Sequence, residues 1–367
     1  MPLGPWTHGR APLRLRALAI IAMAAVSGCG GGGGTNTSRA SSAAPSSTTS
    51  AAVPVTAAPA ATAPVATTAP TEPTAGPART FAVGIQKSTF VDASRATPAT
   101  SGARGANTRT LPTTIWYPAE GVHSAADAAN APPATRSGPF PLVIWGHGWN
   151  LAGRHYQSFL HRWASAGYVI AAPNFPTSTS DGNGAGPAGG DDESAEPGDL
   201  SFVATSVIRL NADSSSPVYR LVDARRVVAG GHSQGAVDAL AMAFAACCRD
   251  ARVGAAVVVA GIDVPERFGA YRFATHTPVL LEQGDQDPYL SVGGARQLYS
   301  RLASPKYLLV LRGTDHNTSK GDATSGAPRV LSQAVVDFCD RYVKGVAGGL
   351  LERDAGAAPF AELAEAP

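Results

Sequence analysis

The chain has 367 residues, of which 15% are charged and 44% are hydrophobic, and its formal net charge is +2. This near-neutral balance excludes nucleic acid as an expected partner, because binding a polyanion requires an excess of basic residues. The length and the apolar fraction favour one large α/β domain over two average domains.

The first 28 residues (1–28) have the pattern of a secretory signal peptide. Three arginines precede an apolar segment, 17–26, that is too short to span a bilayer. The residues Val26-Ser27-Gly28-Cys29 follow, and they resemble the bacterial lipobox, in which the cysteine is acylated and becomes the new N-terminus. We therefore expect an extracytoplasmic protein anchored to the cell membrane through Cys29; the alternative is an ordinary cleaved signal and a secreted protein.

Residues 29–78 are predicted to form a disordered tether. They are rich in Gly, Thr, Ser, Ala and Pro, with almost no charge and no large apolar side chain. Such a segment cannot bury enough surface to offset its ordering entropy. It would hold a folded domain away from the membrane.

The segment 79–347 alternates strand patterns with helix patterns, which predicts a doubly wound, mostly parallel sheet flanked by helices. Strands are expected at 81–91, 110–117, 140–145, 168–172, 227–229, 253–260, 278–281 and 307–311, and helices at 155–166, 200–210, 236–244, 292–302 and 330–343. The last residues, 348–367, are Ala-rich and are expected to form a peripheral tail.

Two further features concern the loops and the cysteines. The segment 177–199 contains six acidic residues and no Lys or Arg, and we interpret it as a mobile acidic loop over one end of the sheet; a calcium loop is the alternative. Besides Cys29, three cysteines remain, so at least one is unpaired within the chain, and a bridge from Cys247 or Cys248 to Cys339 is possible. No cysteine or histidine spacing predicts a metal site.

The chemistry centres on Gly231-His232-Ser233-Gln234-Gly235, which lies between a predicted strand and a predicted helix. A strand that turns within two residues into a helix holds its central side chain on a strained bend and points it out of the sheet. The flanking Gly231 and Gly235 remove Cβ atoms that would collide with neighbouring backbone. Ser233 is therefore the candidate nucleophile.

Two more polar residues follow later strands. Asp287 comes after the strand ending near residue 281, and His316 comes after 307–311. In a parallel sheet these positions share the edge where ligands bind, and the order Ser, Asp, His is that of an α/β-hydrolase. Asp285 and Asp263 are alternatives for the acid.

Each residue type has a chemical task in this arrangement. A serine hydroxyl needs an imidazole to remove its proton, and the imidazole needs a carboxylate to fix its tautomer. The oxyanion needs preorganised donors, for which we expect the backbone N–H groups of Trp149 and Gln234. The side chain of His232 should point away from the nucleophile, and His147 should shape the oxyanion loop.

The sequence resembles the bacterial α/β-hydrolases related to dienelactone hydrolases and platelet-activating-factor acetylhydrolases. The motifs that carry the resemblance lie between about residues 80 and 345, at 110–118, 140–148, 166–173, 231–235 and 284–288. An aromatic residue at the position of Trp149 is also similar to cutinase-like polyester hydrolases. One departure is that true dienelactone hydrolases have a cysteine at the position of Ser233.

This resemblance implies ester hydrolysis through an acyl-serine intermediate, with Ser233, His316 and Asp287 in the roles given above. We expect an esterase for short or medium acyl groups, acting as a monomer on small or polymeric esters without a cofactor or a metal. The alternatives are an acyltransferase acting on cell-envelope acceptors and a catalytically inactive scaffold that binds at the cell surface.

Overall fold

The computed structural model describes residues 80–100, 104–179, 192–346 and 350–366. The expected signal peptide, the lipidation site at Cys29, the tether and the middle of the acidic segment, 180–191, lie outside these residues. Among these residues, none of the helices combines the length and the hydrophobicity that a membrane-spanning helix needs.

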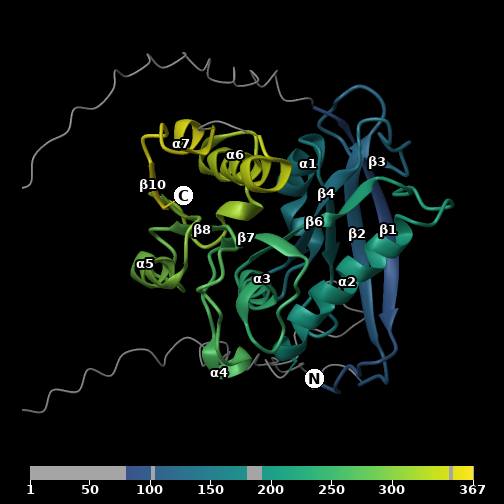
Figure 1. Cartoon of the computed structure of the whole chain (residues 1–367), viewed down its shortest axis with the longest axis horizontal. Coiled ribbons are helices and arrows are strands. Elements are labelled where there is room, and N and C mark those ends of the chain that lie inside the picture. The colour runs from purple at the N-terminus through teal and green to yellow at the C-terminus, as the bar shows by residue number, and fades with distance from the viewer. Residues whose placement is uncertain (1–79, 101–103, 180–191, 347–349, 367) are drawn as a thin grey trace, which may run out of the picture. The chain divides into compact units, whose positions relative to one another are not determined.

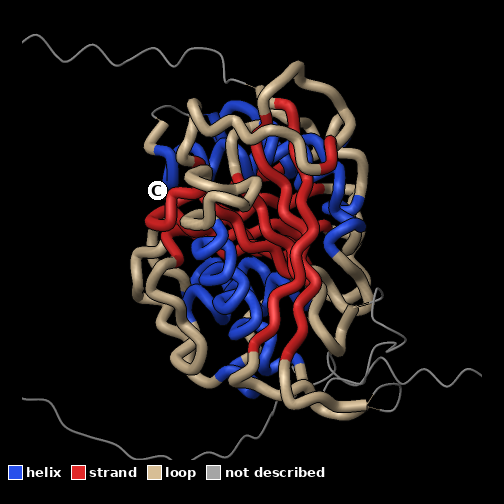
Figure 2. The backbone as a smooth tube through the Cα atoms, turned by 90° about the vertical axis from the view of Figure 1, so that its right-hand side faces the viewer, coloured by secondary structure: helices blue, strands red, loops and turns tan. Residues whose placement is uncertain are grey.

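One ten-stranded sheet carries the candidate site. Its strands are β1 (Ala82–Asp92), β2 (Arg109–Ala119), β3 (Ala128–Ala129), β4 (Phe140–Gly146), β5 (Val169–Pro173), β6 (Val222–His232), β7 (Val253–Val259), β8 (Val279–Gly284), β9 (Lys306–Leu311) and β10 (Ala361–Ala366). They are arranged in the order β10-β9-β8-β7-β6-β4-β5-β2-β1-β3, and Figure 2 shows them as one twisted layer. The six strands from β9 to β5 are parallel, which confirms the predicted mostly parallel sheet.

The strands at the centre of the sheet are apolar on both faces, as parallel strands covered by helices on both sides must be. All seven residues of β4 and all five of β5 are buried, as is usual where helices cover both sides of a sheet. The long strands β1 and β2 pair antiparallel and extend the sheet beyond β5.

Helices cover both faces of this sheet (Figure 1). They are α1 (Gln157–Ser165), α2 (Glu196–Leu210), α3 (Gln234–Phe244), α4 (Pro265–Phe268), α5 (Val292–Arg301), α6 (Gly326–Cys339) and α7 (Leu350–Asp354), together with 3-10 turns at 153–156, 193–195 and 318–320 and a π-helical turn at 340–344. Side chains of α1, α6 and α7 pack on one face, and those of α2, α3 and α5 pack on the other. A fully buried large side chain such as Trp163 or Phe338 contributes about 1.5–3 kcal/mol through its removal from water.

The expectation of a peripheral tail at 348–367 is wrong for its described residues, 350–366, which form helix α7 and strand β10. Strand β10 pairs antiparallel with β9 and forms an edge of the sheet, from Ala361 opposite Leu311 to Ala366 opposite Lys306. Leu351 of α7 is fully buried in the core. The Ala-rich sequence has no strong strand pattern, and the segment joins the sheet through its backbone pairing with β9.

The described parts of the acidic segment are also not a mobile loop. The guanidinium of Arg109, which is 1% exposed, donates to Asp199 Oδ1 at 2.7 Å and Oδ2 at 2.6 Å, and to Asp192 Oδ2 at 2.7 Å. Helix α2 begins at Glu196, four residues earlier than predicted. The prediction failed because the cation that neutralises these carboxylates comes from strand β2, far away in the sequence.

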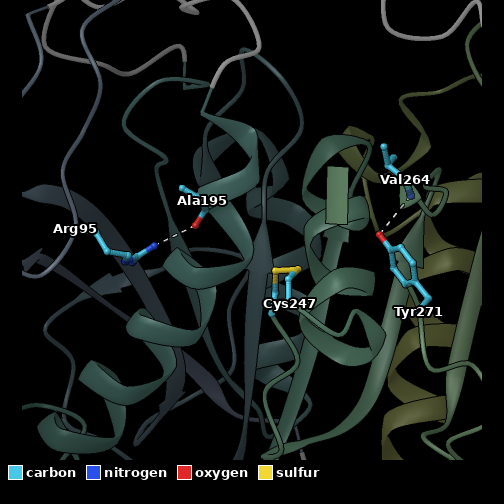
Figure 3. Close-up of a disulfide and its surroundings, with 6 residues drawn as sticks. Arg95, Ala195, Cys247, Val264 and Tyr271 are labelled. Carbon is cyan, nitrogen blue, oxygen red and sulfur yellow. Dashed lines mark hydrogen bonds between the residues drawn. A yellow bond between two sulfur atoms is a disulfide. The ribbon is translucent and has the colours of Figure 1, made fainter. Parts of the chain in front are cut away.

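The cysteines pair differently from the bridge that we considered. Cys247 and Cys248, just after α3, form a disulfide with each other (Figure 3). Cys339 is a buried free thiol. Cys248 and Tyr271 both pack against one small apolar cluster, and the hydroxyl of Tyr271 accepts a hydrogen bond from the N–H of Val264 at 3.3 Å. The disulfide therefore lies where the end of α3 meets the loop that follows β7.

Candidate active site

The turn from β6 to α3 has the strained geometry that the sequence predicts. Ser233 has φ 54° and ψ −121°, a conformation that a residue with a side chain rarely adopts. A Cβ on Gly231 would lie 2.2 Å from the carbonyl oxygen of Gly235, and a Cβ on Gly235 would lie 2.2 Å from backbone atoms of Gly146. Only glycine fits at these two positions, so the serine side chain is held at the end of β6.

Three predicted side chains meet at the carboxyl edge of the sheet. His316 Nε2 lies 2.8 Å from Ser233 Oγ, and His316 Nδ1 lies 2.6 Å from Asp287 Oδ2. Because an ionised carboxylate only accepts hydrogen bonds, Nδ1 carries the ring proton of a neutral imidazole. Nε2 is then able to accept the proton of the serine hydroxyl, which is the arrangement that activates a nucleophile.

The surroundings of Asp287 favour its charged form. Burial acts to raise the pKa of this carboxyl, but hydrogen bonds from His316 and from the backbone N–H groups of Leu290 and Tyr289 outweigh it, and the net shift is downward. These two N–H groups donate to Oδ1 at 3.0 and 2.8 Å, and Gln283 Nε2 donates to Oδ2 at 2.8 Å. The carboxylate is therefore fixed in position and ionised at neutral pH.

The two alternative acids have other partners. Asp285 Oδ1 accepts a hydrogen bond from the N–H of Gly313 at 2.7 Å. Asp263 forms an ion pair with Arg301 through both carboxylate oxygens. In the described part of the chain, Asp287 is thus the carboxylate that contacts His316.

The two residues expected to supply the oxyanion donors are close to the serine in the chain or in space. Gln234 follows Ser233 directly, and Trp149 follows Gly148, where an added Cβ would lie 3.2 Å from the Cβ of Ser233. Neither amide N–H donates a hydrogen bond to another described residue. The loop is held by His147, whose Nε2 accepts from the N–H of Phe175 at 3.0 Å, so the side chain shapes the loop as expected.

The contacts of the Gln234 side chain could not be predicted from the sequence. Its Nε2 donates to Asp238 Oδ1 at 3.1 Å, and its Oε1 accepts from Arg267 Nη1 at 3.2 Å. Asp238 lies against Glu196, and both carboxyls are fully buried. Burial is the main cause that raises the pKa of Glu196, to about 8, and the pKa of Asp238 well above its usual value.

A further buried carboxyl, that of Glu282, lies near Asp287. Glu282 of β8 is 3% exposed, and burial followed by the charge of Asp287 raises its pKa to about 8. The sequence did not single out this glutamate, because it lies at the end of an apolar run that predicts an ordinary buried strand. Over the described residues, no group of three or more His, Cys, Asp or Glu side chains is arranged to hold a metal ion.

Comparisons with known proteins agree with this architecture. A family model described as Chlorophyllase matches residues 130–281, which is less than half of the chain and includes Ser233 but neither Asp287 nor His316. The solved structure of a ferulic acid esterase from Streptomyces cinnamoneus matches with a TM-score of 0.59 and 22% identity, over 79% of this chain and 98% of that chain. The comparison with curated protein sequences gives no significant match.

The narrower likeness to dienelactone hydrolases, acetylhydrolases and cutinase-like enzymes stays a prediction, because neither match belongs to these groups by name. The sheet order, the flanking helices and the match over nearly the whole length of a solved esterase confirm the broader prediction. The chain has the α/β-hydrolase fold and resembles the esterases that are built on it.

Proposed function

We propose that the protein is a serine hydrolase that cleaves carboxylic esters. The observation that carries this proposal is the continuous hydrogen-bonded series of Ser233, His316 and Asp287 at the edge of the sheet. The likeness to a solved ferulic acid esterase and to the Chlorophyllase family model supports an esterase rather than an inactive scaffold.

In the proposed reaction, Ser233 Oγ attacks the ester carbonyl carbon while His316 Nε2 takes the hydroxyl proton. Asp287 stabilises the imidazolium that forms, and the N–H groups of Trp149 and Gln234 stabilise the oxyanion. The tetrahedral intermediate collapses, the bond to the alcohol oxygen breaks, and His316 gives its proton to the leaving alcohol. Water then attacks the acyl-serine by the same route and releases the carboxylic acid and the free serine.

The surroundings of His316 indicate where the alcohol part of the ester lies. The ring of Tyr289 is 54% exposed and meets the imidazole edge to face, with ring centroids 5.0 Å apart. Because His316 must protonate the leaving oxygen, the alcohol passes close to this ring. We propose esters with short or medium acyl groups as substrates.

We also propose that the enzyme works outside the cytoplasm, attached to the cell membrane through a lipid on Cys29. This proposal rests on the arginines, the apolar segment and the lipobox-like residues at the N-terminus. Metabolic labelling with a fatty-acid analogue tests it: the wild-type protein should be labelled, and a Cys29→Ala variant should not.

A series of p-nitrophenyl esters of increasing acyl length tests the catalytic proposal. The wild-type protein should hydrolyse the short and medium members, and Ser233→Ala should lower kcat by about 10⁴-fold or more. Ser215→Ala, which changes an exposed serine in the loop between α2 and β6, is the control and should retain full activity. Equal rates for Ser233→Ala and the wild type would exclude Ser233 as the nucleophile.

A further inference from the structure

A second chain of hydrogen bonds runs beneath the three candidate catalytic side chains. The N–H of Gly148 donates to the hydroxyl oxygen of Tyr156 at 2.9 Å, and this hydroxyl lies 2.9 Å from His232 Nδ1. On the other side of its ring, His232 Nε2 lies 2.6 Å from the carbonyl oxygen of His316. Tyr156 and His232 are each 1% exposed, so water does not compete for these bonds.

The donor of each bond can be assigned from the partners. The carbonyl oxygen of His316 only accepts, so His232 Nε2 carries a proton. Burial, followed by the nearby His316, lowers the pKa of His232 to about 3, so the ring is neutral and its Nδ1 is bare. The hydroxyl of Tyr156 must then donate to Nδ1, and burial raises the pKa of this phenol, which keeps its proton in place. The whole chain is therefore oriented in one direction, from Gly148 to His316.

The two ends of this chain are parts of the proposed catalytic machinery. Gly148 immediately precedes Trp149, whose N–H is the expected oxyanion donor. At the other end, the carbonyl belongs to the same residue whose imidazole contacts Ser233. The chain thus joins the loop after β4 to the loop after β9, which are separated in the sheet by β6, β7 and β8.

The packing leaves little freedom for this connection to change length. A Cβ on Gly148 would lie 3.1 Å from His232 Nδ1. The ring of His232 contacts the rings of both neighbours, with centroids 5.6 Å from Tyr156 and 4.9 Å from His316. A shift of either loop must therefore be transmitted to the other or break a buried hydrogen bond.

We propose that Tyr156 and His232 are positioning residues that hold the oxyanion loop and the base loop in a fixed relation across Ser233. The proposal rests on the esterase function proposed above. In this role His232 is neither the base nor a nucleophile; it acts through its neutral tautomer, with the proton on Nε2. The histidine that precedes the candidate nucleophile thus has a structural role of its own, which is to connect the two loops.

Tyr156→Phe is the sharpest test, because it removes one oxygen atom and leaves the ring. Without the hydroxyl, the N–H of Gly148 loses its hydrogen-bond acceptor, and His232 Nδ1 loses its hydrogen-bond donor. Since an oxyanion donor acts mainly in the transition state, we expect kcat to fall about 10- to 100-fold with KM within about twofold. A His232→Gln variant, which keeps one donor and one acceptor, should retain more activity than His232→Leu.

Tyr117→Phe is the matched control. Tyr117 is also fully buried, and its hydroxyl donates to the carbonyl oxygen of Ala131 at 2.8 Å, away from the site. Tyr117→Phe loses this one hydrogen bond, whereas Tyr156→Phe loses two, so both variants should lose some thermal stability. Only Tyr156→Phe should lower kcat.

The tautomer of His232 gives a readout that does not depend on activity. Nitrogen-15 NMR should show a neutral ring with the proton on Nε2 in the wild type. In Tyr156→Phe the proton should stay on Nε2, which still donates to the carbonyl oxygen of His316, and the signal of Nδ1 should shift because its hydrogen-bond donor is gone. A proton on Nδ1 in the wild type, or an unchanged kcat in folded Tyr156→Phe, would overturn the proposal. If the wild-type protein neither hydrolyses esters nor reacts with a fluorophosphonate, the esterase function fails instead, and the tautomer measurement still tests the chain of bonds.

Discussion

The imidazole Nε2 of His316 lies 2.8 Å from the hydroxyl oxygen of Ser233, although 83 positions separate the two residues in sequence. Ser233 follows β6 and His316 follows β9. In the sheet, β7 and β8 lie between these two strands. The loop after β9 must therefore bend back along the sheet edge, and its carbonyl at residue 316 is held there by His232. The candidate site thus depends on a loop conformation as much as on the strands.

Replacement of Asp287 by Asn should inactivate the enzyme without unfolding it. The amide cannot stabilise the imidazolium, and it can hold His316 in the wrong tautomer, so we expect kcat to fall by about 10⁴-fold. Steady-state kinetics with a p-nitrophenyl ester measures this. Asp285→Asn is the matched control, because Asp285 bonds the N–H of Gly313 and not the histidine, and it should retain most activity. An equal loss in both variants would contradict the assignment of the acid.

Gly235→Ala should destabilise the fold as well as the site. The new Cβ would overlap the backbone of Gly146, which is rigid in the sheet, so we expect a loss of about 2 kcal/mol or more in the free energy of unfolding. Urea denaturation measures this loss as a lower midpoint at constant slope. Gly293→Ala in α5, where the new Cβ has its nearest contact at 3.6 Å, should change stability by less than about 1 kcal/mol. A Gly235→Ala protein as stable as the wild type would contradict the close approach of Gly235 to the backbone of Gly146.

The buried carboxyl of Glu196 should make stability fall as the pH rises. Its pKa rises from 4.5 to about 8 on folding, mainly because of burial. Between these two values the folded protein keeps a proton that the unfolded chain has lost, so the free energy of unfolding decreases by up to about 1.4 kcal/mol per pH unit. Below this range the contribution is fully present, and above about pH 8 the loss is complete.

Urea denaturation of the wild type and of Glu196→Gln between pH 5 and 9 isolates this contribution. The variant cannot lose a proton at this position, so its stability should fall less steeply from pH 5 to pH 8. Glu362→Gln, at a 51% exposed side chain that pairs with Arg296, is the control and should follow the wild-type curve. Parallel curves for the wild type and Glu196→Gln would mean that this carboxyl is ionised in the folded protein.

Mass spectrometry of the oxidised protein should find Cys247 joined to Cys248. Cys339 is buried at 2% exposure, so it should react with a maleimide only after denaturation. A native protein whose Cys339 is oxidised, or is labelled as fast as an exposed thiol, would contradict this pairing.

The sequence predicted the elements whose signals are local. The apolar runs at 140–145 and 168–172, and the glycines on either side of Ser233, indicate strands and a turn from neighbouring residues alone. It could not choose among Asp263, Asp285 and Asp287, because the choice depends on loop conformations after β7 and β8. It also missed the pair of Arg109 and Asp199, whose members are 90 positions apart. The tail was misjudged because Ala-rich edge strands have no strong pattern.

The most direct test of the central claim is to locate a covalent adduct. Incubation with a fluorophosphonate, followed by digestion and mass spectrometry, should place one adduct on Ser233. The adduct should be absent from Ser233→Ala and should form much more slowly in His316→Ala, because the hydroxyl then has no base. A folded wild-type protein that forms no adduct, or that carries it on a different serine, would contradict the proposed mechanism.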